Sequence, residues 1–528
     1  MGRRLIRGIR EVVTNRPRQS TSARLLTNGG WNALSAGVAA TVAFLLVPFL
    51  LSRLGAAAYG TWVLIGSLFA YSSVLHFGLT SAVSRHVAVA LAAGTGDDVR
   101  RIVTTGTAFF SGVAVVLSTL TLVVYQFVGR WFHIPAGMLG DARTAVLVVG
   151  LFLALAVVAE ASGAAISGYQ RYDLLAMGRV SMNLLRAAAL VVVVGRGGGL
   201  VAVAWVYALT ELGVNLLYAL FAVRLLPVRV LQARRFDAAL MPEMLAYGGN
   251  TFLYSSGAVI AYKASEVLIG AFGQAEDVAR YSVAGMGVLA LAAVIESLTA
   301  AIKPAVSDLD ARDAGSTIHE LALLAGKYGL LIILPSTAFF VLMGDDFLRL
   351  WTGLTDPDVS CAMALLAVGQ AFRLAQQGNF LVLAGKGEHR FFGLSVLLVG
   401  GGTVVLTVLA LGVLGFGIVG AAAASTASWM VVAGIVIPRH VNAQLGVTPR
   451  ERRLKVYRPA LAGGAPAIAL VIGWKWLHAP GSWGELIMVV AVVAAVTAAG
   501  AWAFALEDQE RAWVSGFVLR FVRRWRLW

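Results

Sequence analysis

The sequence predicts an all-helical membrane protein with about fourteen transmembrane helices. Hydrophobic residues make up 59% of its 528 residues and charged residues only 13%, and the mean hydropathy is +0.80. A soluble protein carries about 25% charged residues, so this chain has too few charges to cover the surface of soluble domains. Apolar runs recur from residue 30 to residue 506, with no polar stretch between them long enough for a soluble domain. A run of about 20 apolar residues spans the hydrocarbon core as a helix.

Reading the apolar runs and the breaks between them predicts fourteen spans. The narrowest break is residues 196–199 (RGGG), which separates the fifth span from the sixth. The predicted spans are 30–53, 60–84, 102–128, 144–168, 178–195, 199–226, 244–272, 281–302, 321–343, 359–384, 391–413, 416–438, 459–477 and 485–506.

The distribution of the 42 Lys and Arg residues predicts the orientation. With fourteen spans, 32 of these residues fall on the side that holds both termini, 6 fall on the opposite side, and 4 lie within spans. Cytoplasmic loops carry the excess of basic residues, so both termini are expected in the cytoplasm. This asymmetry also accounts for the net charge of +15, and no nucleic acid partner is expected.

An internal repeat divides the spans into two sets of six. Residues 168–172 (GYQRY) follow the fourth span, and residues 387–391 (GEHRF) follow the tenth, 219 residues later. Glycine-rich segments before the sixth and twelfth spans, and Asn28 and Asn250 at the first and seventh, recur at nearly the same offset. Because six is even, the two copies share one orientation and predict two parallel bundles around a central cavity.

The predicted organisation has seven parts. These are a basic cytoplasmic N-terminus (1–29), an N-terminal six-helix lobe (30–226), a cytoplasmic linker (227–243), a C-terminal six-helix lobe (244–438), a basic cytoplasmic loop (439–458), helices 13 and 14 (459–506) and an amphipathic basic tail (507–528). In the tail, aromatic residues recur at helical spacing between arginines, a pattern typical of a helix on an anionic inner leaflet.

Charged residues within spans are candidate functional groups, because a charge at membrane depth is costly unless it faces the protein interior. Arg373 lies in a polar stretch of the tenth span, and its planar guanidinium suits a phosphate oxygen. Lys263 and Glu266 share one helix face and can pair, so a structural role and a substrate role are equally compatible with them. The full set is Glu160, Arg186, Glu211, Lys263, Glu266, Glu296 and Arg373.

The carboxylates of this set outnumber its bases, so at least one lacks a basic partner and is a candidate proton carrier. Glu296 is the first candidate for ion coupling, because its span has no base before Lys303; Glu160, Glu211 and Glu266 are the others. Proton coupling, sodium coupling and uncoupled transport all fit the sequence, and no other cofactor is expected.

Catalytic and metal functions find little support in the sequence. The predicted outer loops are short, and no Walker, HExxH or GxSxG motif occurs. Cys361 is the single cysteine, which excludes an intrachain disulfide and a cysteine-based metal centre. We therefore expect neither an enzyme nor a metalloprotein.

The sequence resembles the polysaccharide transporter family over most of its length, most clearly in the first 180 residues. The matching features are Asn28 with Asn32, Pro48, residues 54–62 (LGAAAYGTW), residues 77–79 (FGL) with Arg85, and residues 168–173 (GYQRYD). That family includes O-antigen and teichoic-acid flippases and belongs to the superfamily of multidrug/oligosaccharidyl-lipid/polysaccharide exporters.

This resemblance implies a V-shaped exporter in the bacterial cytoplasmic membrane. It implies a flippase that moves an undecaprenyl-diphosphate-linked oligosaccharide to the outer leaflet through a basic cavity, with glycan polymerases and glycosyltransferases as candidate partners. Arg85, Arg186, Lys263 and Arg373 are then the candidates for binding the diphosphate or the glycan. The alternatives are a multidrug or organic-cation exporter of the same superfamily, a lipid II flippase, and a membrane glycan polymerase or transferase.

Overall fold

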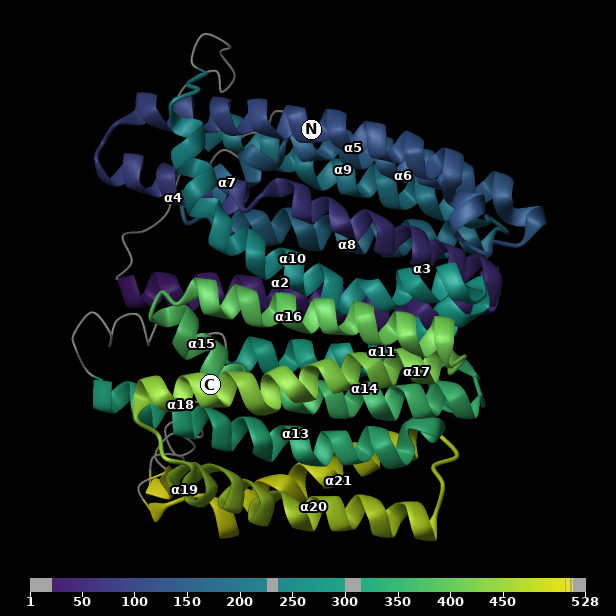
Figure 1. The fold of residues 1–528 in the computed structure, drawn as a ribbon, viewed down its shortest axis with the longest axis vertical. Coiled ribbons are helices and arrows are strands. Elements are labelled where there is room, and N and C mark those ends of the chain that lie inside the picture. The colour runs from purple at the N-terminus through teal and green to yellow at the C-terminus, as the bar shows by residue number, and fades with distance from the viewer. Residues whose placement is uncertain (1–20, 226–235, 300–314, 509, 513–514, 516–528) are drawn as a thin grey trace, which may run out of the picture. The chain divides into compact units, whose positions relative to one another are not determined.

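The computed structural model describes residues 21–225, 236–299, 315–508, 510–512 and 515. Every regular element in these ranges is a helix (Figure 1), and twelve of the helical segments are long and apolar enough to cross a membrane. They correspond to twelve of the predicted spans. The remaining two, 244–272 and 281–302, are helices α10 (Leu240–Phe272) and α11 (Ala275–Thr299). Neither helix is among the twelve.

The helices of the first half follow the apolar runs and extend beyond them. The helices are α2 (Thr21–Leu54), α3 (Ala56–Ala70), α4 (Leu79–Ala92), α5 (Gly96–Trp131), α6 (Leu139–Val158), α7 (Glu160–Gly168), α8 (Tyr172–Gly195) and α9 (Leu200–Leu225). The predicted break between the fifth and sixth spans is confirmed, because Gly197 has a φ of +90° between α8 and α9. A left-handed conformation of this kind favours glycine and ends a helix.

The second half continues from α10 and α11 in the same way. The helices are α13 (Gly315–Thr352), α14 (Pro357–Ala375), α15 (Gln377–Gly385), α16 (His389–Val408), α17 (Gly417–Val431), α18 (Ile437–Leu445), α19 (Pro449–Arg452), α20 (Arg458–Leu477) and α21 (Trp483–Gly500). Short π-helical turns, at Leu409–Val413, Val432–Val436, Arg453–Tyr457 and Ala501–Ala505, continue α16, α17, α19 and α21.

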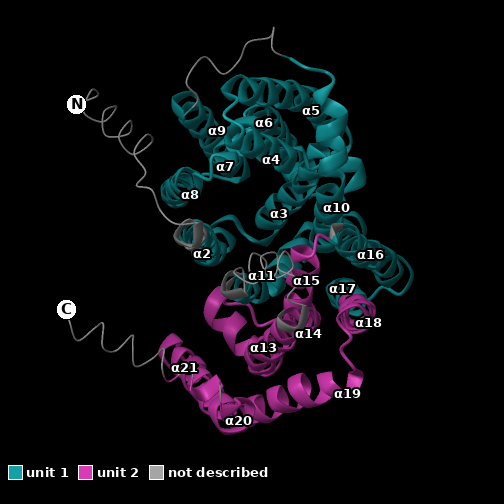
Figure 2. Ribbon diagram, turned by 90° about the vertical axis from the view of Figure 1, so that its left-hand side faces the viewer, with its two compact units in different colours: residues 1–301, 388–428 teal, residues 302–387, 429–528 magenta. Residues whose placement is uncertain are grey.

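The chain forms two compact units, coloured separately in Figure 2. Unit 1 comprises residues 1–301 and 388–428, and unit 2 comprises residues 302–387 and 429–528. Within unit 1, α6 packs between α5 and α9, and α10 runs along α16 while also contacting α3 and α4 (Figure 1). Within unit 2, α13 packs against α14 and α20, and α20 pairs with α21. The predicted six-helix lobes divide the chain differently and stay predictions.

The second predicted span, 60–84, is not one continuous helix. It consists of α3, a 3₁₀ segment η1 (Tyr71–His76) and α4. Phe77 and Gly78 both have positive φ between the last two. A Cβ on Gly78 would lie 2.2 Å from the carbonyl oxygen of Gly248 in α10, so glycine allows both the turn and the close approach. No Asp, Glu, Lys or Arg occurs in residues 54–84, which is why a search for apolar runs missed this break.

The two halves break at corresponding places. The fourth predicted span is α6 followed by the nine-residue helix α7, and the tenth is α14 followed by the nine-residue helix α15. Each short helix leads directly into one copy of the GxxR motif. The offset between α7 and α15 is close to that of the sequence repeat. The two copies of the repeat therefore also share the position at which a transmembrane helix is interrupted.

Two predictions at the polar ends require comment. The basic loop predicted at 439–458 is mostly helical, since α18 ends at Leu445 and α19 begins at Pro449. A helix can continue past the hydrocarbon core into water, so the end of an apolar run does not mark the end of a helix. Most of the amphipathic tail predicted at 507–528, and most of the basic N-terminus, lie outside the described residues.

Candidate functional site

Unit 1 contains a cavity of about 640 Å³, here called the first cavity. Its walls come from α2, α3, α6, α8 and α9, with contributions from α10 and α11. The α2 wall is apolar, with residues such as Val42, Leu46 and Leu50. Charged and amide groups come from other helices: Asn183, Arg186, Glu211 and Lys263. The first cavity therefore has one apolar wall and a cluster of polar groups facing it.

Arg186 of α8 and Glu211 of α9 form an ion pair in this cavity. The Arg186 Nη2 donates to Glu211 Oε2 at 2.7 Å, and its Nε donates to Thr210 Oγ1 at 2.8 Å. The guanidinium carbon also lies 4.1 Å from the centroid of the Tyr207 ring. Three neighbouring residues of α9 thus hold the guanidinium in one orientation.

Lys263 of α10 is paired as well. Its Nζ donates to Glu266 Oε2 at 2.8 Å, and Glu266 also accepts a hydrogen bond from Ser67 of α3. The side chain of Lys263 remains 36% exposed, whereas that of Glu266 is 9% exposed. Glu266 therefore lies behind the cavity wall and links α3 to α10, while Lys263 reaches the cavity.

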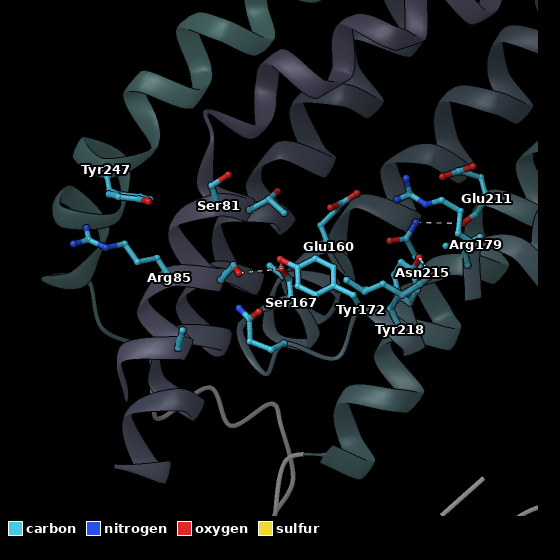
Figure 3. A pocket seen from close by; sticks show the side chains of 18 residues that line it. Ser81, Arg85, Glu160, Ser167, Tyr172, Arg179, Glu211, Asn215, Tyr218 and Tyr247 are labelled. Atoms are coloured by element: carbon cyan, nitrogen blue, oxygen red, sulfur yellow. Dashed lines mark hydrogen bonds between the residues drawn. The ribbon is translucent and has the colours of Figure 1, made fainter. Parts of the chain in front are cut away.

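A second cavity of about 490 Å³ lies in the same unit, between α4, α7, α8, α9 and the first turns of α10. Figure 3 shows Arg85 beside Tyr247 on one side, and Arg179 on the side of Glu211 and Asn215. The Arg85 guanidinium carbon is 4.4 Å from the Tyr247 ring centroid. Glu160, the first residue of α7, also lines it. Glu211 lines both cavities, so they adjoin at this residue.

The structure brings together six of the eight residues that the sequence singled out. Arg186, Glu211 and Lys263 line the first cavity, and Glu266 binds Lys263 behind it. Arg85 and Glu160 line the second cavity. Their roles in binding or coupling stay predictions.

The other two predicted residues lie elsewhere. Arg373 belongs to unit 2 and is 7% exposed; its Nε donates to Gln370 Oε1 at 2.6 Å, and its guanidinium carbon lies 5.9 Å from the Trp429 ring centroid. Glu296 is exposed near the end of α11 and lines neither cavity. The absence of a base from its predicted span was insufficient to identify a cavity carboxylate.

Several lining residues were missed by the sequence analysis. On α8 they are Arg179 and Asn183, at seven and three residues before Arg186. Residues at these spacings share one face of a helix. Asn215 and Tyr218 stand four and seven residues after Glu211 on α9, which also places them on one face of that helix. Two polar faces at helical periodicity were therefore the signal, and a search limited to charges within spans did not use it.

No group of three or more His, Cys, Asp or Glu residues that could hold a metal ion occurs within the ranges that the structure describes. Cys361 is exposed. The polar groups that line the two cavities are hydrogen-bonding and charged side chains.

Comparisons with known proteins agree with this architecture. Residues 25–310 match the family described as polysaccharide biosynthesis protein, while a comparison with curated protein sequences found no significant match. Among solved structures, the lipid II flippase MurJ in an inward closed conformation has a TM-score of 0.66 at 12% identity, covering 90% of this chain and 97% of that chain.

Two other solved structures share the fold. An inward-facing multidrug resistance MATE family transporter of the MOP superfamily has a TM-score of 0.65 at 15% identity, over 82% of this chain and 100% of that chain. A MOP superfamily transporter from Pyrococcus furiosus has a TM-score of 0.57 at 15% identity, over 81% of this chain and 99% of that chain. At these identities the likeness establishes the fold, and the family match covers more than half of the chain. This multi-pass membrane protein belongs to the polysaccharide biosynthesis protein family.

Proposed function

We propose that this protein is a flippase that moves an undecaprenyl-diphosphate-linked oligosaccharide from the inner to the outer leaflet of the bacterial cytoplasmic membrane. The first cavity carries this proposal, because it combines an apolar α2 wall with Arg186 and Lys263 inside a helical membrane unit. A lipid-linked diphosphate has the same two parts, an apolar chain and an anionic headgroup that cannot cross hydrocarbon unaided. The family match and the likeness to the lipid II flippase support it.

Arg186 and Lys263 are already paired with carboxylates, and this affects how a diphosphate would bind to them. Each base has an acidic partner, Glu211 for Arg186 and Glu266 for Lys263. An arginine carries five N–H donors and a lysine three, so one carboxylate does not exhaust either group. A diphosphate would bind by sharing these donors, and the carboxylates would favour its release afterwards.

A leaflet-accessibility assay on reconstituted protein tests the proposal. Vesicles carry the purified protein and a fluorescent undecaprenyl-diphosphate oligosaccharide, and a membrane-impermeant quencher reports the leaflet. We expect Arg186→Gln to slow translocation at least tenfold, because the planar guanidinium is lost. Arg196→Gln is the matched control, since Arg196 is exposed ten residues later, just after α8, and should stay within twofold of wild type. If wild-type protein does not move the lipid, the proposal is wrong.

The same vesicles test the organic-cation alternative. Trp62 and Tyr207 line the first cavity with rings 5.2 Å apart, and Glu211 lies beside them, which are groups that attract cations. Arg186 and Lys263 would repel a cation in the same space. We therefore expect no uptake of cationic dyes, and uptake that requires Glu211 would favour a multidrug exporter.

Energy coupling is proposed to act through the cavity carboxylates rather than through Glu296. Glu160 and Glu211 line the second cavity. Glu266 accepts a hydrogen bond from Lys263, which lines the first cavity. Imposing a proton gradient or a sodium gradient on the vesicles separates the two ions, and a rate unaffected by both would indicate uncoupled flipping. Both termini are proposed to be cytoplasmic, which would place the basic tail against anionic inner-leaflet lipid.

A further inference from the structure

The second cavity differs from the first in the chemistry of its walls. Most of its lining residues have polar side chains, including hydroxyl groups from α4 and α7, phenols from α8, α9 and α10, and the amides of Gln170 and Asn215. The apolar α2 wall of the first cavity has no counterpart here. A ligand of the second cavity must therefore offer hydrogen-bonding groups in many directions.

The charges around the second cavity balance. Arg85 and Arg179 contribute two bases, and Glu160 and Glu211 contribute two carboxylates. The residues that line the first cavity include two bases and one carboxylate, whereas the two bases here face two carboxylates, so this lining has no net charge that would favour a free anion or a free cation. Charged donors and charged acceptors arranged around one space suit a neutral group whose hydroxyls both donate and accept.

Hydrogen bonds between the hydroxyl groups of one wall fix their positions. Ser84 donates to Ser167 at 3.2 Å, and Ser167 donates to the Tyr172 hydroxyl at 3.1 Å (Figure 3). The Tyr218 hydroxyl donates a hydrogen bond to the carbonyl oxygen of Leu175 at 2.8 Å, so the orientation of this phenol is also fixed. On the opposite side, Tyr247 is 41% exposed, and the Arg85 guanidinium lies over one face of its ring. The cavity thus combines a fixed row of hydroxyls with an exposed aromatic ring.

We propose that the second cavity binds the glycan part of the substrate, while the first cavity binds the diphosphate and the adjacent lipid. The sugar hydroxyls would exchange hydrogen bonds with the charged and amide groups, and the apolar face of a sugar ring would lie on Tyr247. Glu211 borders both cavities, so a single substrate can occupy both at once. This assignment rests on the proposed flippase function and specifies where the carbohydrate is recognised.

Equilibrium binding of two lipids to the purified full-length protein tests the assignment. One lipid is an undecaprenyl-diphosphate oligosaccharide, and the other is undecaprenyl diphosphate without sugar. Tyr247→Leu should weaken binding of the glycan-bearing lipid about fivefold or more and leave binding of the bare lipid unchanged. Tyr254→Leu is the matched control, because Tyr254 lies on the same helix, is also 41% exposed, and lines neither cavity.

Two further variants separate the possible outcomes. Arg179→Gln should repeat the selective loss without altering an aromatic contact, whereas Arg186→Gln should weaken binding of both lipids. Unchanged glycan binding in both Tyr247→Leu and Arg179→Gln would overturn the assignment, and so would an equal loss for the two lipids. Failure of wild-type protein to bind either lipid would overturn the proposed function itself.

Discussion

A buried ion pair in unit 2 allows a sharp test of how the last two helices are held. Lys327 lies within α13 and is 3% exposed. Its Nζ donates to both carboxylate oxygens of Glu510, at 2.6 and 2.7 Å, and to the carbonyl oxygen of Ala505 at 3.3 Å. The Tyr328 hydroxyl and the Glu507 backbone N–H donate to the same carboxylate, at 3.0 and 2.7 Å. The Glu510 carboxylate, each of whose oxygens accepts two hydrogen bonds, therefore holds the segment that follows α21 against α13.

Glu510→Gln leaves the ammonium of Lys327 buried without a charged partner. Removing one member of a buried pair costs about 3–5 kcal/mol, and since glutamine keeps one acceptor oxygen we expect a loss of about 3 kcal/mol at pH 7. Burial opposes ionisation of Glu510, but the hydrogen bonds from Lys327, the Glu507 N–H and Tyr328 lower its pKa below the ordinary value. The stabilisation is thus complete above about pH 4.3, the ordinary pKa of a glutamate, and is lost as the pH falls through the lowered pKa of the folded state.

Denaturant titration of the purified protein in detergent micelles measures this loss. Asp508→Asn is the matched control: it removes the same charge two residues away, where the side chain is 99% exposed and its ion pair with Arg511 is worth at most about 1 kcal/mol. We expect Glu510→Gln to unfold at lower denaturant than both the wild type and Asp508→Asn at pH 7, and the difference to shrink below pH 4. Equal unfolding midpoints for the two variants at pH 7 would refute the reasoning.

Three further predictions concern packing, unit 2 and topology. A Cβ on Gly60 would lie 1.7 Å from the carbonyl oxygen of Ala275, so Gly60→Ala must separate α3 from α11; we expect a thermal midpoint several degrees lower, and an unchanged midpoint would contradict the packing. Arg373 lines neither cavity, so the sequence-based prediction that it binds the diphosphate has its own test: Arg373→Gln should abolish translocation in the leaflet assay while membrane insertion stays normal, and wild-type transport would remove Arg373 from the substrate path. Alkaline phosphatase fused after Trp528 should be inactive and green fluorescent protein at the same site fluorescent, because 32 basic residues lie on the predicted inner side; active phosphatase would invert the topology.

The helical architecture was predictable because hydrocarbon leaves the backbone few choices. In lipid every backbone polar group must bond within its own segment, so apolar runs read directly as helices, and even the four-residue break at 196–199 lies where the sequence predicts it. The interruptions at η1 and at Gln376 were not predictable from hydropathy. They depend on local backbone conformation, as at Phe77 and Gly78, and apolarity does not report it.

The candidate site was predictable in its charges and not in its shape. The rule that intramembrane charges face the interior identified Arg186, Glu211 and Lys263 correctly as cavity residues. It could not assign Glu296, which is exposed, because position along a helix says nothing about the neighbours that other helices supply. Uncharged residues such as Asn215 were missed for a related reason: their cost in lipid is small, and only their spacing along α9 marks them.

Pairing of the cavity charges also bears on how a flippase can let its substrate leave. Unpaired bases in a low-dielectric cavity would bind a diphosphate so strongly that release would become slow, and the same bases would be costly to fold into the membrane. Arg186 is paired with Glu211, and Lys263 with Glu266; in the proposed flippase this pairing would avoid both costs, because each carboxylate would take back its base when the substrate departs. Glu211 has a second role, since it borders the polar cavity as well. A substrate that draws Arg186 away from Glu211 would alter the hydrogen bonds offered to its own glycan, so recognition of the diphosphate and of the sugar would be coupled through one side chain.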